Sequence, residues 1–220
     1  MERFHQFPGP KGTEQHAVSV GTHRYIVNVV RAAGRDDQDR CVVRPRADGF
    51  FAVLSDGAGS SGHGLEAAEA VVQGLAEAAA GGPDGLGDRI VAVDDALAAG
   101  HGGQATALAF FLGPEGLAGA GVGDTELWWR DAQGWHEGTA NVTRRPLVGT
   151  GAATVVNLHA PLPDVLVAAT DGLWKYAAPF EVLALVDAHP SDPVRVLDPL
   201  WLEAGGLPDD VTVLIARRMP

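Results

Sequence analysis

Short apolar segments separated by turn residues fill the first quarter of the chain. β-branched and other apolar residues are concentrated at about 17–30, and again at 40–43 and 50–54. This alternation of apolar runs and turns is typical of a meander of antiparallel strands. The pattern then changes, because residues 65–80 place apolar side chains at every third or fourth position, which predicts an amphipathic helix. A second helix is expected at 90–99.

The second half of the chain repeats the alternation between strands and helices. Its apolar segments predict strands at 105–112, 117–122, 125–130, 165–169 and 211–216, with helices at 180–188 and 193–203. The order of strands, two helices, strands, two helices and a strand predicts an α+β fold: a four-layer αββα sandwich of two antiparallel β-sheets flanked by helices. Two glycine-containing loops, 100–104 and 139–151, are predicted to be mobile.

Composition agrees with one globular domain. With 220 residues, 46% of them hydrophobic, the chain can bury one substantial core, so we expect a single domain over 1–220. The net charge of -12 argues against a nucleic-acid partner, since phosphate backbones are bound by basic surfaces. No apolar run approaches the ~20 residues of a membrane-spanning helix, and 1–11 does not resemble a signal peptide. We therefore expect no membrane association.

The expected cellular setting follows from residue usage. A single cysteine excludes an internal disulfide and is compatible with a reducing cytoplasm, so we expect a cytoplasmic protein. Abundant alanine and glycine, with more arginine than lysine, indicate a GC-rich bacterial genome.

Acidic residues stand at the ends of three predicted strands. The apolar run 50–54 leads into Asp56, the run 165–169 leads into Asp171, and the pair Asp209-Asp210 precedes the strand 211–216. If the last strand runs antiparallel to the first two, its beginning lies beside their ends. Clustered carboxylates repel one another unless a cation neutralises them, so the arrangement predicts a divalent metal site. Its oxygen-only donors suit magnesium or manganese better than zinc or copper.

Six segments of the chain follow one another in an informative order. They are Gln38-Asp39, Ser55-Asp56-Gly57-Ala58-Gly59, Thr106-Ala107, Gly121-Val122-Gly123-Asp124, Ala169-Thr170-Asp171-Gly172-Leu173-Trp174 and Asp209-Asp210-Val211-Thr212. In this order they resemble the motifs of metal-dependent protein phosphatases of the PP2C (PPM) family, in particular its bacterial members. The resemblance runs from about residue 21 to 216 and implies one PP2C-like phosphatase domain.

The resemblance also implies an activity and a set of site residues. The expected activity is a serine/threonine protein phosphatase that hydrolyses phosphoprotein monoesters with a metal-activated water. The catalytic residues implied are Asp56, Asp171 and Asp209, and the metal-binding residues implied are Asp39, Asp56, Gly57, Asp124, Asp171 and Asp209. Two Mg²⁺ or Mn²⁺ ions are expected, bridged by Asp56, with a third ion at Asp124. The partners implied are a phosphorylated protein and a cognate bacterial kinase or its targets.

The chain departs from the family at the phosphate-binding position. The family's arginine is expected five residues before Asp39, where Gly34 stands, and Arg35 follows one position later. Arg35 is therefore the candidate phosphate-binding residue, with a solvated loop arginine as the alternative. The same departure keeps a second function open, a catalytically weak PP2C-like regulatory or phosphoprotein-binding module. Retention of the mutually repelling carboxylates favours the enzyme.

Two rival motifs have less support. Residues 57–62 spell the glycine pattern of a dinucleotide-binding loop, but a second helix follows where a Rossmann unit requires a strand. A cysteine-based phosphatase needs an arginine at the sixth position after its cysteine, and Ala47 stands there after Cys41. Cys41 lies in an apolar segment and is expected to pack in the core.

Overall fold

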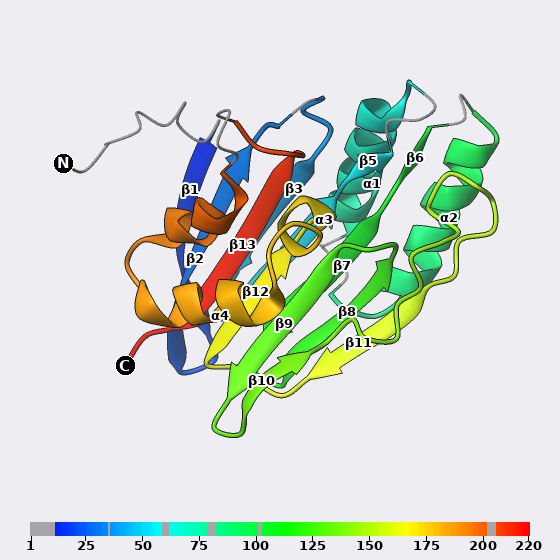
Figure 1. The fold of residues 1–220 in the computed structure, drawn as a ribbon. Coiled ribbons are helices and arrows are strands. Elements are labelled where there is room, and N and C mark those ends of the chain that lie inside the picture. The colour runs from blue at the N-terminus through cyan, green and yellow to red at the C-terminus, as the bar shows by residue number, and fades with distance from the viewer. Residues whose placement is uncertain (1–11, 35, 59–61, 79–81, 101–102, 202–205) are drawn as a thin grey trace.

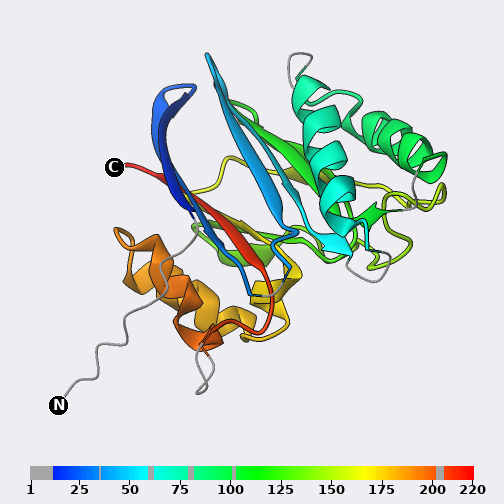
Figure 2. The same ribbon diagram turned by 90° about the horizontal axis from the view of Figure 1, so that it is seen from above.

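The computed structural model describes residues 12–34, 36–58, 62–78, 82–100, 103–201 and 206–220 (Figure 1). Two antiparallel sheets pack face to face, and helices cover both outer faces, as the view in Figure 2 shows. The predicted four-layer αββα sandwich is confirmed.

One sheet has six strands and the other has five. The six-stranded sheet has the order β1 (Gly12–Val20), β2 (His23–Ala32), β13 (Val211–Arg218), β12 (Val165–Ala169), β9 (Glu126–Asp131) and β10 (Gly134–Glu137). The five-stranded sheet has the order β11 (Val156–Ala160), β8 (Gly116–Val122), β7 (Ala107–Gly113), β4 (Gly49–Ser55) and β3 (Arg40–Arg46). A short ribbon joins β5 (Gly57–Ala58) to β6 (Gln104–Ala105) beside the end of β4.

The helices divide between the two outer faces. On the five-stranded sheet lie α1 (Gly64–Ala78) and α2 (Leu86–Ala98), and on the six-stranded sheet lie α3 (Asp171–Trp174), α4 (Pro179–Ala188) and the 3₁₀ helix η3 (Pro193–Leu200). The α-helix predicted over 193–203 is corrected to this 3₁₀ helix, and residues 202–205 lie outside the described part. Pro199 lacks an N–H and clashes with a preceding carbonyl in an α-helix, which explains the difference. No helix in the described ranges is long and apolar enough to cross a membrane.

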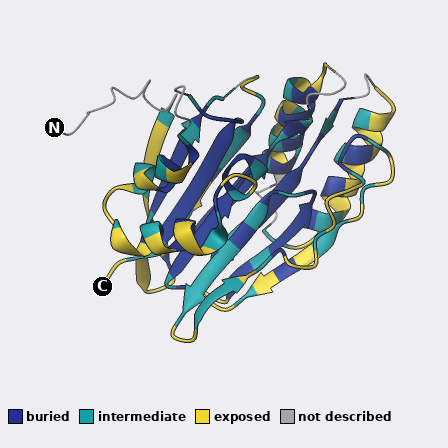
Figure 3. Ribbon diagram, viewed as in Figure 1, coloured by how far each residue is buried: buried dark blue, intermediate teal, exposed yellow. Residues whose placement is uncertain are grey.

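The central strands are apolar at every position because they are buried on both faces. In β4, Phe50, Ala52 and Leu54 pack between the two sheets, whereas Phe51 and Val53 pack under the helices. β12 is buried on both faces in the same way, and Figure 3 shows the buried strands at the centre of the molecule. Two-sided burial of this kind yields continuous apolar runs rather than an alternating pattern.

The loop before β11 is fixed by one buried carboxylate. Asp94 of α2 accepts hydrogen bonds at Oδ1 from the backbone N–H groups of Gly149 (2.6 Å), Thr150 (2.9 Å) and Gly151 (2.9 Å), and at Oδ2 from Ala153 (2.8 Å). Backbone donors bonded to an anion are strongly held. A carboxylate from a distant helix therefore holds the backbone at 149–153, and the expected mobility of 139–151 stays a prediction.

Candidate metal centre

Strand pairing brings Asp171 and Asp209 to the same end of the six-stranded sheet. β12 and β13 are antiparallel, with Ala169 opposite Val213, so the end of β12 lies beside the beginning of β13. The backbone N–H of Thr170 donates to the carbonyl of Thr212 and extends this pairing (3.1 Å). The two acidic segments that flank these strands in the sequence therefore meet in space.

Asp56 reaches the same place from the facing sheet. The sequence suggested three neighbouring strands, but β4 belongs to the five-stranded sheet and does not pair with β12 or β13. The Asp56 backbone is held on both sides by Thr106, which accepts from the Asp56 N–H at Oγ1 (2.9 Å) and donates its own N–H to the Asp56 carbonyl (2.8 Å). The Thr106 hydroxyl also contacts the Thr125 hydroxyl (2.7 Å). This network fixes where β4 delivers its carboxylate.

A cavity of about 290 Å³ opens where the two sheets deliver these carboxylates. Its lining consists of Asp56, Gly57, Ala58, Thr106, Asp124, Arg144, Arg145, Leu147, Asp171 and Asp209. Five of the six residues that the resemblance implies as metal ligands thus share one cavity.

Asp39, the sixth, is buried beside this cavity. It lines an adjoining hollow of about 360 Å³ together with Asp210 and Thr212. Its Oδ2 accepts a hydrogen bond from the Thr170 hydroxyl (2.7 Å), while Oδ1 has no hydrogen-bond partner within the described residues. The Thr212 hydroxyl influences the pKa of Asp39 but lacks bonding geometry to it. A buried carboxylate oxygen without a donor is costly unless a cation or water satisfies it.

The carboxylates of this cluster are difficult to ionise together. Burial, followed by the charges of Asp39, Asp171 and Asp124, raises the pKa of Asp56 to about 9. Burial raises the pKa of Asp39 to about 7, with further contributions from Asp210 and Asp171. The pKa of Asp171 is raised as well, first by burial and then by the charge of Asp124. A cation is the simplest partner that lets all of them ionise at neutral pH.

The donor set fits a hard divalent cation that keeps part of its water shell. No three acidic, histidine or cysteine side chains within the described ranges converge closely enough to enclose an ion by themselves. Magnesium usually retains several waters and takes only one or two carboxylates, so a closed protein cage is not required. The unpartnered Oδ1 of Asp39 and the carboxylates around the cavity satisfy this looser requirement.

The adjacent residues Asp209 and Asp210 have different surroundings. Asp209 lines the acidic cavity, and its Oδ2 lies 3.5 Å from the Lys175 ammonium at the rim. Asp210 is buried and accepts the backbone N–H of Gly34 at Oδ1 (2.8 Å) and that of Gln38 at Oδ2 (2.9 Å). Asp210 therefore organises the segment that carries Asp39, while Asp209 faces the cavity.

Close backbone packing accounts for the glycine at position 34, where the resemblance implies an arginine. A Cβ atom on Gly34 would overlap the carbonyl group of Asp209, and one on Gly172 would overlap the carbonyl group of Asp210. The chain entering β13 thus passes between two glycines, and any side chain at position 34 would displace Asp209. Arg35, the candidate phosphate-binding residue, lies outside the described residues.

Sequence reasoning missed the cations near the cavity. Arg144 and Arg145 line it directly, and Lys175 pairs with Asp209 at its edge. A signal was present, since 144–145 is one of only two adjacent arginine pairs in a strongly acidic chain, the other being 217–218. Sequence alone could not connect the pair with the site, because distant parts of the chain position this loop. The Gly123 N–H donates to the Thr143 carbonyl (3.2 Å), and Asp94 holds the backbone that follows at 149–153.

Comparison with known proteins identifies the fold. No protein-family model matches the sequence, and no curated protein matches it at a significant level. Among solved structures, the catalytic domain of the serine/threonine protein phosphatase PstP with two manganese ions superposes with a TM-score of 0.68 at 20% identity, covering 89% of this chain and 99% of that one. The PPM Ser-Thr phosphatase MsPP from Mycobacterium smegmatis, in complex with cacodylate, gives 0.68 at 20% identity, covering 91% and 99%.

A third similar structure comes from a secretion pathway. PppA, a key regulatory component of the type VI secretion system in Pseudomonas aeruginosa, superposes with a TM-score of 0.66 at 21% identity, covering 93% of this chain and all of that one. These likenesses show that the chain has the fold of bacterial PP2C-type (PPM) phosphatases, as the sequence motifs predicted.

Proposed function

We propose that the protein is a serine/threonine protein phosphatase that requires Mg²⁺ or Mn²⁺. The observation that carries the proposal is the convergence of Asp56, Asp124, Asp171 and Asp209 on one cavity that also contains two arginines. Carboxylates alone would repel a phosphate, so the cavity is suited to an anionic substrate only when cations occupy the acidic part. The PstP structure contains two manganese ions in the same fold, which supports this choice of metal.

We assign roles to the acidic residues by their position. Asp56, the Gly57 carbonyl, Asp171 and Asp209 would hold two ions, and Asp124 would hold a third. Asp39 would accept hydrogen bonds from water through its free Oδ1. When bound, such ions lower the pKa of a coordinated water and neutralise phosphoryl oxygens.

The remaining cavity residues would position the substrate. Arg144 and Arg145 present guanidinium groups, which bind phosphate oxygens through paired hydrogen bonds. Thr106 would keep Asp56 in place through its two backbone contacts. Cys41 would take no part, because burial raises the pKa of its thiol to about 12 and a thiolate nucleophile is not available at neutral pH.

The physiological substrate class that fits this site is a phosphorylated protein, for example a target of a bacterial kinase in the cytoplasm. The second function, a catalytically weak regulatory or phosphoprotein-binding module, has one observation in its favour. Gly34 replaces the family's phosphate-binding arginine, and the packing against Asp209 does not admit a larger residue.

One assay distinguishes the two functions. Purified protein is incubated with p-nitrophenyl phosphate and with a phosphothreonine peptide, each with manganese, with magnesium or with a chelator. The enzyme is expected to hydrolyse both substrates with metal and neither with chelator. Binding of the phosphopeptide without turnover in any metal would instead favour the regulatory module.

A further inference from the structure

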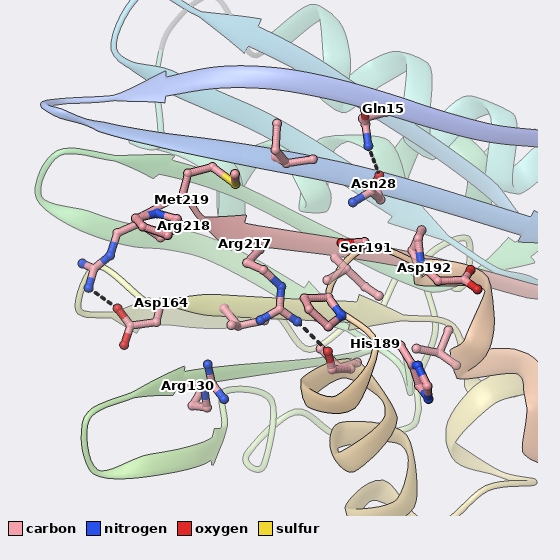
Figure 4. A pocket seen from close by; sticks show the side chains of 18 residues that line it. Gln15, Asn28, Arg130, Asp164, His189, Ser191, Asp192, Arg217, Arg218 and Met219 are labelled. Carbon is pink, nitrogen blue, oxygen red and sulfur yellow. Dashed lines mark hydrogen bonds and ion pairs between the residues drawn. The ribbon is translucent and has the colours of Figure 1, made fainter.

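A second cavity lies at the opposite end of the β12–β13 strand pair from the acidic site. It has a volume of about 660 Å³ and lies between the six-stranded sheet, the end of α4 and the following turn at 189–193 (Figure 4). β12 and β13 run through both regions, with Val165 and Arg217 here and Asp171 and Asp209 at the opposite end. Asp171 lies six positions after Val165, which corresponds to at most about 20 Å along an extended chain.

Strand register defines the floor of this cavity. Across the sheet, Arg217 of β13 is opposite Ile26 of β2 on one side and opposite Val165 of β12 on the other, and Val165 is opposite Arg130 of β9. Directly opposed residues in adjacent strands project from the same face of the sheet. Arg217 and Arg130 therefore stand on one face with Val165 between them, about 10 Å apart at two strand spacings.

A second row of the sheet makes the floor amphipathic. Ile215 of β13 is opposite Asn28 of β2, which accepts a hydrogen bond at Oδ1 from the Gln15 amide (2.8 Å). Val186 of α4 and Val196 of η3 form the apolar wall above it. The cavity thus combines apolar surface with polar groups at one side, in the size range of small-molecule sites.

Arg217 makes no direct ion pair within the described residues, and Asp187 acts on it only as a nearby charge. Arg130 pairs with Asp187 (2.7 Å), Arg218 pairs with Asp164, and Asp192 pairs with Arg195 (3.6 Å). Within the described ranges Arg217 makes one hydrogen bond, to the Val186 carbonyl (2.6 Å), and no ion pair. Its guanidinium is partly buried and has further N–H donors, so it retains capacity for an oxyanion.

We infer that this cavity is a second binding site, one for a small organic oxyanion. A carboxylate or phosphate group would be held by Arg217, and an apolar body would lie on Val165 and Ile215 beneath Val186. The site differs in chemistry from the acidic cavity, because it attracts an anion through the protein's own arginine and needs no metal. A half-buried, unpaired guanidinium over an apolar floor is the feature that selects this class of ligand.

A matched pair of probes tests this site. Isotope-labelled protein in chelator is titrated with 1-naphthoate and with 1-naphthamide, which share a ring system but differ in charge, and amide NMR shifts are recorded. Chelator prevents metals from recruiting the anion to the acidic cavity. We expect saturable shifts around Val165, Val186 and Ile215, with naphthoate binding at least ~10-fold more tightly than naphthamide, as a charged hydrogen-bonded contact implies.

Two variants complete the test. Arg217→Gln should weaken naphthoate binding by ~10-fold or more and leave naphthamide unaffected, whereas Arg89→Gln, which removes an exposed arginine from α2, should change neither. If Arg217→Gln does not fold, Arg217→Lys is expected to keep a preference for naphthoate. Equal affinity of the wild type for both probes, shifts confined to other surfaces, or undiminished naphthoate binding in Arg217→Gln would each overturn the site.

Discussion

The two ends of the β12–β13 strand pair carry opposite charges. The two ends also differ in how many of these charges are paired with a side chain of opposite charge. At one end, Asp171 and Asp209 join other carboxylates around a cavity, and the cations nearby are fewer than the acids. At the other end, Arg217 and Arg218 are the last residues of β13. Most of the arginines in this region form an ion pair with an aspartate. The strands are the same scaffold in both places, so the difference lies in the residues placed at their ends.

The comparison shows how a cluster of mutually repelling charges differs from a cluster of ion pairs. At the acidic end, burial and neighbouring charges raise the pKa values of Asp56, Asp39 and Asp171, so the folded protein disfavours the ionisation of all three together. At the arginine end, ion pairs connect loops and α4 to the sheet, whereas Arg217 makes a hydrogen bond but no ion pair within the described ranges. The acidic end is therefore suited to cations, and the arginine end is suited to a single anionic group.

The largest expected effect follows from removing one carboxylate of the acidic end. Asp171→Asn should lower phosphatase activity by ~100- to 1,000-fold, the range for loss of one electrostatic group at a reacting centre. Asp56→Asn should behave alike. Asp95→Asn, which neutralises an exposed acid on α2, is the matched control and should retain full activity. Steady-state hydrolysis of p-nitrophenyl phosphate with manganese measures the change, and near-normal activity in Asp171→Asn would remove this residue from the site.

Substitutions of the two adjacent acids that precede β13 should separate metal binding from the order of the segment that holds Gly34 and Gln38. Asp209→Asn is expected to weaken manganese binding by ~10- to 100-fold, because its carboxylate faces the cavity. Asp210→Asn replaces one carboxylate oxygen with an NH₂ group, which cannot accept the hydrogen bond from the backbone of Gly34 or Gln38. It should therefore lower the free energy of unfolding by about 1–3 kcal/mol and leave the manganese affinity nearly unchanged.

Calorimetric titration measures the manganese affinity of both variants, and thermal unfolding measures their stability. If Asp210→Asn loses metal affinity and Asp209→Asn does not, the orientation of the two side chains at the start of β13 is the reverse of the one described.

Replacing the cavity arginines should have a smaller effect, concentrated on substrate binding. The double variant Arg144→Gln/Arg145→Gln is expected to raise KM for a phosphothreonine peptide by ~10-fold with a minor change in kcat, since a ground-state contact to phosphate is lost. Arg89→Gln again serves as the control for loss of a positive charge. Unchanged kinetics in the double variant would leave phosphate binding to the metals and to residues outside this loop.

Local sequence signals were sufficient for the architecture and for most of the acidic site. The apolar runs of β4 and β12 ended at Asp56 and Asp171 as predicted, because burial on both faces leaves a pattern that can be read directly. The order of motifs indicated the fold that the structural comparison shows. The sequence did not reveal that β4 belongs to the opposite sheet, since strand pairing depends on contacts between distant segments.

Features that depend on tertiary contacts were not predictable. The loop with Arg144 and Arg145 is held by the Gly123 N–H at the Thr143 carbonyl and, further along, by Asp94, whose sequence context is that of an ordinary helix residue. The 3₁₀ conformation of η3 replaced an α-helix around Pro199. The arginine cavity arises from the register of four strands and could not be deduced from any single segment.

The last prediction concerns how pH and metal act together on the acidic end. In the metal-free protein the pKa of Asp56 is about 9 and that of Asp39 about 7, both above the ~3.9 of an aspartate in an unfolded chain. Between the unfolded-state pKa and these raised values, the folded state binds more protons than the unfolded state. The free energy of unfolding therefore falls as the pH rises from about 4 to 9. Metal binding requires deprotonated carboxylates and therefore strengthens over the same range.

Manganese should consequently raise the melting temperature by several degrees at pH 7.5 and by much less at pH 5. Thermal unfolding with and without chelator, at both pH values, measures this difference. Asp56→Asn removes the group with the largest shift, so its metal-free form should lose less stability as pH rises and gain less from manganese. Asp95→Asn should follow the wild type throughout. A wild-type protein whose metal-free stability rises between pH 5 and 8 would show that the carboxylates at this end of the strands are already compensated, which would erase the contrast with the arginine end.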